Sequence, residues 1–229
     1  MSRLTQALHG DLPLLCSWPE LDHYQRGALP PGQRWFGPNT LPSAGRHTPH
    51  WPEGDGPRVF AYLRATHPQH REALLALDQA GCRVLCYMPE VAAGQPHPLR
   101  SPRITYAGGP VNLDEALPQS DLCVCHAGEA TIAQSLLAGV PLLLMPMQAE
   151  QFLMAMRTEA TGAALNAAAR PGPTPYAALV AALLNEPAYR AAAEAFGQRH
   201  GGFSREAQTQ DIVSAIESLL TDTAARPLS

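Results

Sequence analysis

Residues 121–151 read DLCVCHAGEATIAQSLLAGVPLLLMPMQAEQ, and this stretch decides the fold. A short apolar run leads into a polar turn, an amphipathic segment, a second apolar run and a second polar turn. Continuous apolar runs are typical of strands that are buried on both faces. The segment between them has helical spacing and stops at Gly139, which can adopt the left-handed cap. A strand, a helix and another strand in this order predict a right-handed crossover between parallel strands.

The same alternation continues on both sides of this stretch. Predicted strands span 58–63, 83–88, 103–107, 122–125, 140–145 and 163–165. Predicted helices span 70–80, 113–117, 129–138, 150–160, 176–185, 187–197 and 205–220. Thr174 and Pro175 suggest an N-cap and a first-turn proline for the helix at 176–185. The fold class is therefore α/β, a Rossmann-like parallel sheet flanked by helices.

The chain divides into three parts by composition. Residues 1–56 are rich in Pro, Gly and His and show little periodicity, so they are a poor candidate for an independent domain. Residues 57–220 hold the alternating strands and helices, and 221–229 read as a frayed tail. No internal repeat is visible.

Composition excludes several classes of protein. The chain has 229 residues, 45% of them hydrophobic, which is enough for a substantial core. A formal net charge of −4 gives no electrostatic footprint for nucleic acid. No run approaches the roughly 20 apolar residues that cross a bilayer, and the start lacks the apolar core of a signal peptide. We therefore expect no membrane span and a cytoplasmic location.

The cysteines point to buried thiols rather than to a metal or a disulfide framework. They are Cys16, Cys82, Cys86, Cys123 and Cys125. Four lie inside apolar runs, and an odd number without a secretion signal fits a reducing compartment. No CxxC motif or matching histidine pair accompanies them, so we expect no metal site.

The first polar turn suits an anionic ligand, with a nucleoside diphosphate as the first candidate. Small residues around Gly128 let a ligand approach the backbone, and the first turn of a helix offers unpaired N–H groups and a positive dipole end. Thr131 can add a hydroxyl, and His126 can donate a ring N–H to a phosphate oxygen. The alternative is that His126 is a strand-end histidine satisfied by the protein and Thr131 a local cap. Glu129 must point away from a diphosphate.

The second polar turn, 146–151, follows a neighbouring strand, so both turns should meet at one edge of the sheet. Glu150 and Gln151 offer acceptors and donors that match sugar hydroxyls. The alternative is that Glu150 simply opens the next helix, where acidic residues are favoured.

The run HAGEATIAQSLLAGVPLLLMPMQAEQ resembles the donor-binding signature of GT-B glycosyltransferases of the macrolide and UDP-glucuronosyl type. The resemblance covers residues 57–220, and 14–38 look like the family's segment that enters its second domain. It implies that this chain is the C-terminal, nucleotide-sugar-binding half of a GT-B fold. Residues 1–56 would then be a remnant of the N-terminal domain and a linker segment.

Carried over by position, the family's diphosphate contacts fall on His126 and on the backbone of Gly128, Glu129, Ala130 and Thr131. The chain departs from the family pattern here, because Ala127 and Ala130 replace two glycines. Each added methyl group narrows the space for phosphate, which leaves room for a changed donor or a degenerate site.

The remaining contacts that the resemblance implies lie in other loops. Glu150 and Gln151 would bind the sugar, and Val111 lies in the loop that meets the nucleotide base. Gln134 stands where many members carry a glutamate that contacts the ribose. Arg64 belongs to the loop that often holds a Gly-Ser pair near the sugar, so it is a possible further contact.

The resemblance also implies an activity. Such enzymes transfer a sugar, typically a hexose, from a UDP- or TDP-sugar to a small-molecule acceptor by an inverting displacement without metal or cofactor. Their catalytic histidine and acceptor site lie in the N-terminal domain. His9, His23, His47 and His50 match no such motif, so the catalytic residue is unknown. We expect the chain to need an acceptor domain or subunit and to be inactive or nearly so alone.

Two alternatives remain, and one expectation concerns assembly. The chain could be a non-catalytic partner protein with a degenerate donor site, which donor binding would discriminate. It could also be another α/β enzyme with the same half-fold, such as an epimerase, although that class also needs two domains. An apolar face left where another domain should pack would favour a homodimer.

Overall fold

The computed structural model describes residues 12–24, 26–30, 32–40, 46–169 and 172–224, which form two compact units. Unit 1 combines Met1–Asn39 with Gly202–Ser229, and unit 2 is Thr40–Gly201. The predicted boundaries at 56 and 220 differ from this division. The last helix belongs to unit 1, together with the N-terminal residues. The sequence could not predict this grouping, because periodicity within a helix does not reveal which segment the helix packs against.

Unit 1 is held together by contacts between segments that are far apart in the sequence. Its helix α9 (Arg205–Ala224) continues into the predicted tail. The Gln208 amide of α9 donates to the Gly37 carbonyl at 2.6 Å, and the Trp18 and Phe203 rings meet edge to face at 5.5 Å. Gly37 has a φ of 80°, and a Cβ there would meet the Phe203 ring, so this approach requires glycine.

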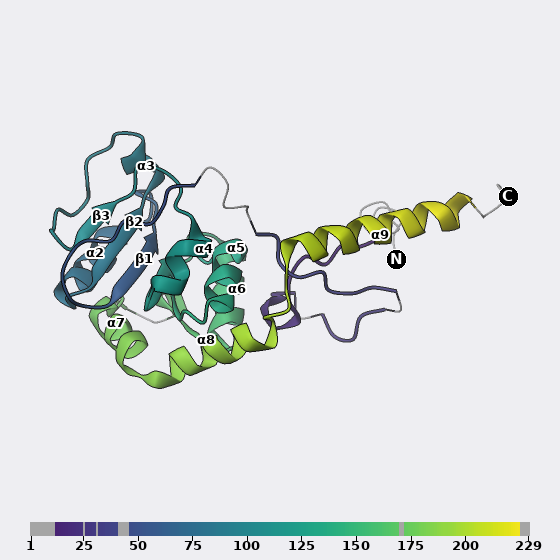
Figure 1. The fold of residues 1–229 in the computed structure, drawn as a ribbon. Helices are drawn as coiled ribbons and strands as arrows, with labels where there is room; N and C mark the ends of the chain where they lie inside the picture. The colour runs from purple at the N-terminus through teal and green to yellow at the C-terminus, as the bar shows by residue number, and fades with distance from the viewer. Residues whose placement is uncertain (1–11, 25, 31, 41–45, 170–171, 225–229) are drawn as a thin grey trace. The chain divides into compact units, whose positions relative to one another are not determined.

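Unit 2 contains a sheet of six parallel strands within its described residues (Figure 1). The strands are β1 (Arg58–Tyr62), β2 (Arg83–Tyr87), β3 (Ile104–Tyr106), β4 (Leu122–Cys125), β5 (Leu142–Leu144) and β6 (Ala164–Asn166). Their order is β3-β2-β1-β4-β5-β6, so the direction of winding reverses between β1 and β4. The predicted fold class is confirmed.

The helices of unit 2 lie where the sequence places them, apart from one. They are α2 (His70–Gln79), α3 (Pro89–Ala92), α4 (Leu113–Ala116), α5 (Glu129–Leu137), α6 (Ala149–Glu159), α7 (Tyr176–Asn185) and α8 (Pro187–Arg199). Only α3 was not predicted. The predicted Thr174 cap is wrong, because Pro175 occupies the cap position of α7 and the Thr174 hydroxyl donates to Gln69 Oε1 at 3.2 Å.

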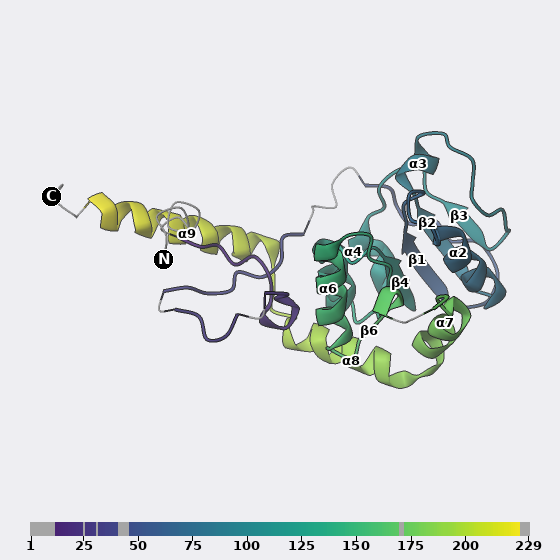
Figure 2. The same cartoon turned by 180° about the vertical axis from the view of Figure 1, so that it is seen from behind.

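The two faces of the sheet are covered by different helices. On one face Val59 and Ala61 of β1 pack with α2 and α7 in a buried cluster that includes Leu74 and Leu179. Strand side chains alternate between faces, so Phe60 of β1 points to the other side. There α5 packs against α8, and α6 contacts β6. Figure 2 shows α6, α8 and β6 from behind.

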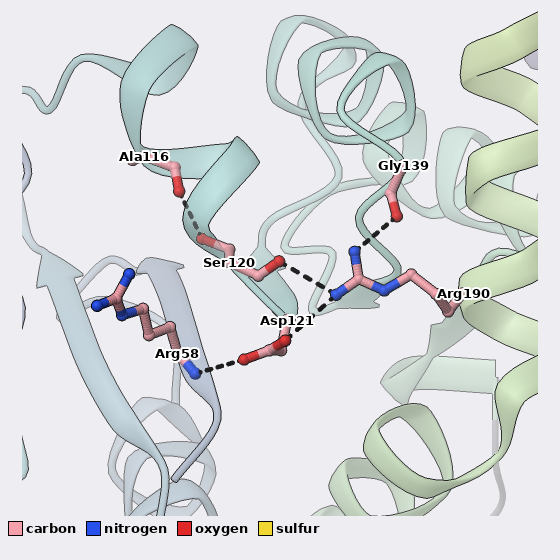
Figure 3. A network of polar contacts seen from close by, with 6 residues as sticks. All are labelled: Arg58, Ala116, Ser120, Asp121, Gly139 and Arg190. Atoms are coloured by element: carbon pink, nitrogen blue, oxygen red, sulfur yellow. Dashed lines mark hydrogen bonds and ion pairs between the residues drawn. The ribbon is translucent and has the colours of Figure 1, made fainter. Parts of the chain in front are cut away.

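At the amino edge of the sheet, Arg190 of α8 fastens several chain segments together (Figure 3). Its guanidinium donates to the Gly139 carbonyl at 3.0 Å and the Ser120 carbonyl at 3.2 Å, and it pairs with Asp121 Oδ1 at 3.4 Å. The other Asp121 oxygen accepts from the Arg58 backbone N–H at 2.8 Å. One side chain thereby joins α8 to the ends of two other elements.

We expect Arg190→Ala to lower the free energy of unfolding by about 1–2 kcal/mol, since it leaves two carbonyls to water and removes a half-exposed ion pair. Urea unfolding of the two proteins measures the difference. Arg190→Lys keeps the charge but loses the forked geometry, so it should fall between them. Equal midpoints for all three proteins would contradict the fastening role.

The cysteine side chains lie where the apolar runs of the sequence predict them. None of the five cysteines, which all lie in the described residues, forms a disulfide, and Cys82, Cys86, Cys123 and Cys125 are buried as predicted. Burial raises the pKa of the Cys82 thiol to about 11. Within the described ranges no helix combines the length and apolarity needed to cross a membrane. The same residues contain no group of three or more His, Cys, Asp or Glu side chains placed to hold a metal ion.

Candidate functional site

The point at which the winding reverses brings two loops together at the carboxyl edge of the sheet. In open α/β sheets ligands bind in the crevice at such a point. The loop after β1 and the turn after β4 meet there, and the Arg64 backbone N–H donates to Nε2 of His126 at 2.8 Å.

A pocket of about 210 Å³ lies at this edge, on the α5 side of the sheet. It brings together four residues predicted for the site, namely Val111, Ala130, Thr131 and Gln134. The other lining residues are Arg46, Phe60, Tyr62, Tyr87, Pro110 and Leu113. The predicted nucleoside contacts and part of the predicted diphosphate turn therefore share one cavity.

The floor of the pocket is aromatic, which was not predicted. Tyr62 and Tyr87 end neighbouring strands in register, and their rings stack with centroids 5.5 Å apart. Burial, with a smaller effect from Tyr62, raises the pKa of Tyr87. The sequence marks both tyrosines as strand residues, but only the pairing of β1 with β2 makes them one surface.

Arg46 reaches the pocket through a short bridge between distant segments. The His47 N–H donates to the Pro110 carbonyl at 2.8 Å, and the Asn112 N–H donates to the His47 carbonyl at 2.8 Å. A Cβ at Gly109 would overlap the His47 ring, so the close approach depends on glycine. No local pattern in the sequence predicts that the segment at His47 pairs with the segment at Val111.

Gln134 does not act alone in the pocket wall. Its amide donates to Asp114 Oδ1 at 3.0 Å, which holds that exposed carboxylate beside the cavity. Asp114 is fixed in turn by Asn112, whose Oδ1 accepts from the Asp114 N–H at 3.1 Å as the cap of α4. The family pattern has a glutamate where this chain has Gln134 of α5. The Asp114 carboxylate of α4 is bonded to Gln134, so an acid lies close to that position.

His126 has both ring nitrogens engaged with the backbone. Nε2 accepts from the Arg64 N–H, so Nδ1 carries the proton and donates to the Met145 carbonyl at 2.7 Å. The ring is 5% exposed, and burial lowers its pKa. In this arrangement the ring has no donor left for the phosphate contact predicted for it. The structure fits the alternative interpretation, in which His126 is a strand-end histidine whose two ring nitrogens bond to the protein itself.

The turn after His126 retains the features that suit an anion. Gly128 is the N-cap of α5, and because glycine has no side chain, no cap residue accepts a hydrogen bond from the first-turn N–H groups. Ala127 has a φ of 58°, the sole positive value for a non-glycine residue in the described ranges. Its place in the family pattern belongs to glycine, and the backbone here explains that preference. Glu129 is half-buried in the same helical turn.

Glu150 and Gln151 do not line this pocket. They lie in the first turn of α6, where Glu150 is exposed and the Gln151 Oε1 accepts from the Met147 N–H at 2.8 Å. The alternative, in which Glu150 opens the helix, fits this placement. A role toward a sugar stays a prediction.

Arg64 meets a partner that was not predicted. Its Nε lies 2.7 Å from Glu90 Oε1, and the Ala65 N–H donates to Glu90 Oε2 at 3.3 Å. Glu90 belongs to α3, which follows β2 at the same edge of the sheet. Pro89 at the first helical position, with an acid directly after it, is a start signal that could have revealed this turn.

Residues 105–200 match the family described as "Glycosyltransferase family 28 C-terminal domain". This part of the chain is similar to the C-terminal domain of these glycosyltransferases. The predicted resemblance is confirmed, and the fold is that of the C-terminal half of GT-B glycosyltransferases. No curated protein sequence gives a significant match.

Solved structures share this fold at low identity. Glycosyltransferase VinC in complex with dTDP is 20% identical, with a TM-score of 0.63 over 90% of this chain and 51% of VinC. Spinosyn rhamnosyltransferase SpnG complexed with thymidine diphosphate is 21% identical, with a TM-score of 0.58 over 82% of this chain and 52% of SpnG. SsfS6 from Streptomyces sp. SF2575, also with thymidine diphosphate, is 21% identical, with a TM-score of 0.56 over 71% and 42%. The chain spans about half the length of these glycosyltransferases.

Proposed function

We propose that this chain binds a nucleoside diphosphate sugar, from the TDP or UDP series, as the donor domain of a glycosyltransferase acting on a small-molecule acceptor. The observation that carries the proposal is the pocket at the β1/β4 edge, beside the uncapped first turn of α5. Thymidine diphosphate is bound to SpnG and SsfS6, which have the same fold, and this favours the TDP series.

Each part of such a donor has a matching surface. The base would lie in the cavity between Phe60, Tyr62 and Val111, where an apolar and aromatic lining suits a planar ring. A hydroxyl of the nucleoside sugar would donate to Asp114, which Gln134 orients. The diphosphate would accept from the first-turn N–H groups of α5, where the helix dipole favours negative charge.

The transfer step needs a general base, and no residue of this chain is assigned that role. In an inverting, metal-independent transfer a base deprotonates the acceptor hydroxyl, which attacks the sugar carbon as the nucleoside diphosphate leaves. The α5 terminus would stabilise the leaving diphosphate without supplying that base. We therefore propose that an N-terminal acceptor domain or subunit provides it, since the chain spans half of its structural relatives. Hexose specificity, cytoplasmic location and a homodimer belong to the same proposal.

Calorimetric titration tests donor binding. We expect TDP to bind about fourfold more tightly than dUDP, which lacks only the methyl group of the base, because one buried methyl group adds about 0.8 kcal/mol. Asp114→Asn should weaken TDP binding about threefold to tenfold, since it replaces a charged acceptor for the hydroxyl of the nucleoside sugar by a neutral one.

Glu115→Gln is the matched control, because it removes the same charge from the adjacent residue of α4. If the two variants lose affinity equally, Asp114 is not the ribose contact. If TDP, UDP and their glucose conjugates all fail to bind, the second candidate gains support, a non-catalytic partner with a degenerate donor site. The carboxylate of Glu90 on Arg64 and alanine at position 127 are the observations that favour this candidate.

A further inference from the structure

The loop after β1 forms a small anion site, and a side chain of the protein itself fills it. The Glu90 carboxylate accepts from Nε of Arg64 at 2.7 Å and from the Ala65 N–H at 3.3 Å. The Glu90 side chain is 15% exposed, whereas that of Arg64 is 44% exposed. One carboxylate thus takes a guanidinium donor and a backbone donor from consecutive residues.

These contacts keep Glu90 ionised. Burial by itself would raise its pKa, but the hydrogen bonds from Arg64 and from the backbone, including Ala65, outweigh burial and hold the pKa below its usual value. Charge-assisted bonds of this kind are the ones that carboxylate and phosphate oxygens form with arginine. The site would accept a phosphate oxygen in the same manner.

The site also adjoins the donor pocket. The Arg64 N–H donates to His126, and the turn that follows His126 leads directly into the first turn of α5. Tyr87 lines the pocket, and nearby charges act on its pKa: Arg46 and Arg64 lower it, whereas Glu90 raises it. Two arginines and one carboxylate therefore act on the same corner of the cavity.

We propose that Glu90 is an internal substitute for the donor's diphosphate, which must displace it from Arg64 and Ala65. The proposal rests on the function proposed above and adds a determinant of affinity to it. A nucleoside diphosphate exchanges the Glu90 contacts for its own, and the released carboxylate turns to water. Glu90 thus weakens binding of anions at this edge of the sheet, while an uncharged nucleoside avoids the competition.

Titration of the whole chain with inorganic pyrophosphate, TDP and thymidine tests the proposal. Glu90→Gln should bind pyrophosphate and TDP about twofold to fivefold more tightly than the parent chain, the range expected for a partly exposed ion pair. Thymidine affinity should not change. The gain should vanish in the double variant Arg64→Gln/Glu90→Gln. Glu53→Gln, an exposed position before the amino end of β1, controls for the loss of one negative charge.

The outcomes separate this proposal from the donor function. If Glu90→Gln lowers the melting temperature and gains no affinity for pyrophosphate or TDP, the ion pair is purely structural and the proposal is wrong. If the parent chain and Glu90→Gln bind TDP equally well, the donor function stands without the competition. If Glu90→Gln gains pyrophosphate binding through Arg64 while TDP never binds, the anion site stands and the nucleotide proposal fails.

Discussion

His126→Ala should lower the free energy of unfolding by about 3 kcal/mol, among the largest effects of any single substitution in the described sheet domain. The ring bridges the Arg64 N–H after β1 and the Met145 carbonyl after β5, on either side of β4. Its removal leaves a buried carbonyl unpaired and opens a cavity where the imidazole is 5% exposed. Urea unfolding at neutral pH measures this cost.

Two further variants separate the bridge from simple loss of volume. Asn can place an amide near the position of Nδ1 and restore the bond to the Met145 carbonyl, so His126→Asn should recover part of the stability. His126→Phe fills the volume without either bond and should stay close to the alanine variant. An alanine variant within about 0.5 kcal/mol of the parent chain would contradict the bridging role.

This result would also change the meaning of lost ligand binding in His126→Ala. The sequence pattern alone makes a direct phosphate contact the natural explanation of such a loss. In the structure the histidine instead holds the loop of Arg64 against the turn that begins at Ala127. Binding would then fall because the two loops separate. Ligand at saturating concentration should then restore occupancy of the site and raise the melting temperature of the variant, because it binds only the arrangement in which the loops meet.

The fold was predictable because its signals are local. A parallel strand buried on both faces is a continuous apolar run, as in 122–125 and 142–144, and the helices between carry their own spacing and end signals. The partners of His126 could not be predicted in the same way. They lie 62 and 19 residues away and use backbone atoms, which no side-chain pattern identifies.

The same reasoning explains the parts of the site that were missed. Glu90 meets Arg64, and Asp114 meets Gln134, only because loops from different strands reach one edge of the sheet. Neither pair has a fixed spacing in the sequence. Conversely, Glu150 and Gln151 follow the expected spacing but lie outside the pocket. Spacing placed the residues on the correct elements and could not determine what each side chain contacts.

His67 should make the folded chain markedly less stable in acid. Its ring is 7% exposed and stacks on His126 with centroids 5.4 Å apart. Burial, reinforced by His126 and His70 and opposed by Glu72, lowers its pKa from 6.5 to about 4. Between pH 6.5 and about pH 4, the unfolded chain therefore binds a proton at this ring, whereas the folded chain keeps the ring neutral. The stabilisation is fully present above the unfolded pKa and is lost as the pH falls toward about 4.

A shift of this size corresponds to about 3 kcal/mol of stability lost between about pH 7 and about pH 4, beyond the loss from carboxylates. His67→Asn removes the titrating ring, while its Oδ1 can still accept from the Gln69 N–H that now bonds to Nδ1 of His67. Urea unfolding across this range should show a flatter pH dependence for the variant. His97→Asn makes the same chemical change on an exposed loop and serves as the control. Parallel curves for the parent chain and His67→Asn would show that the stacked histidines carry no proton-linked stability.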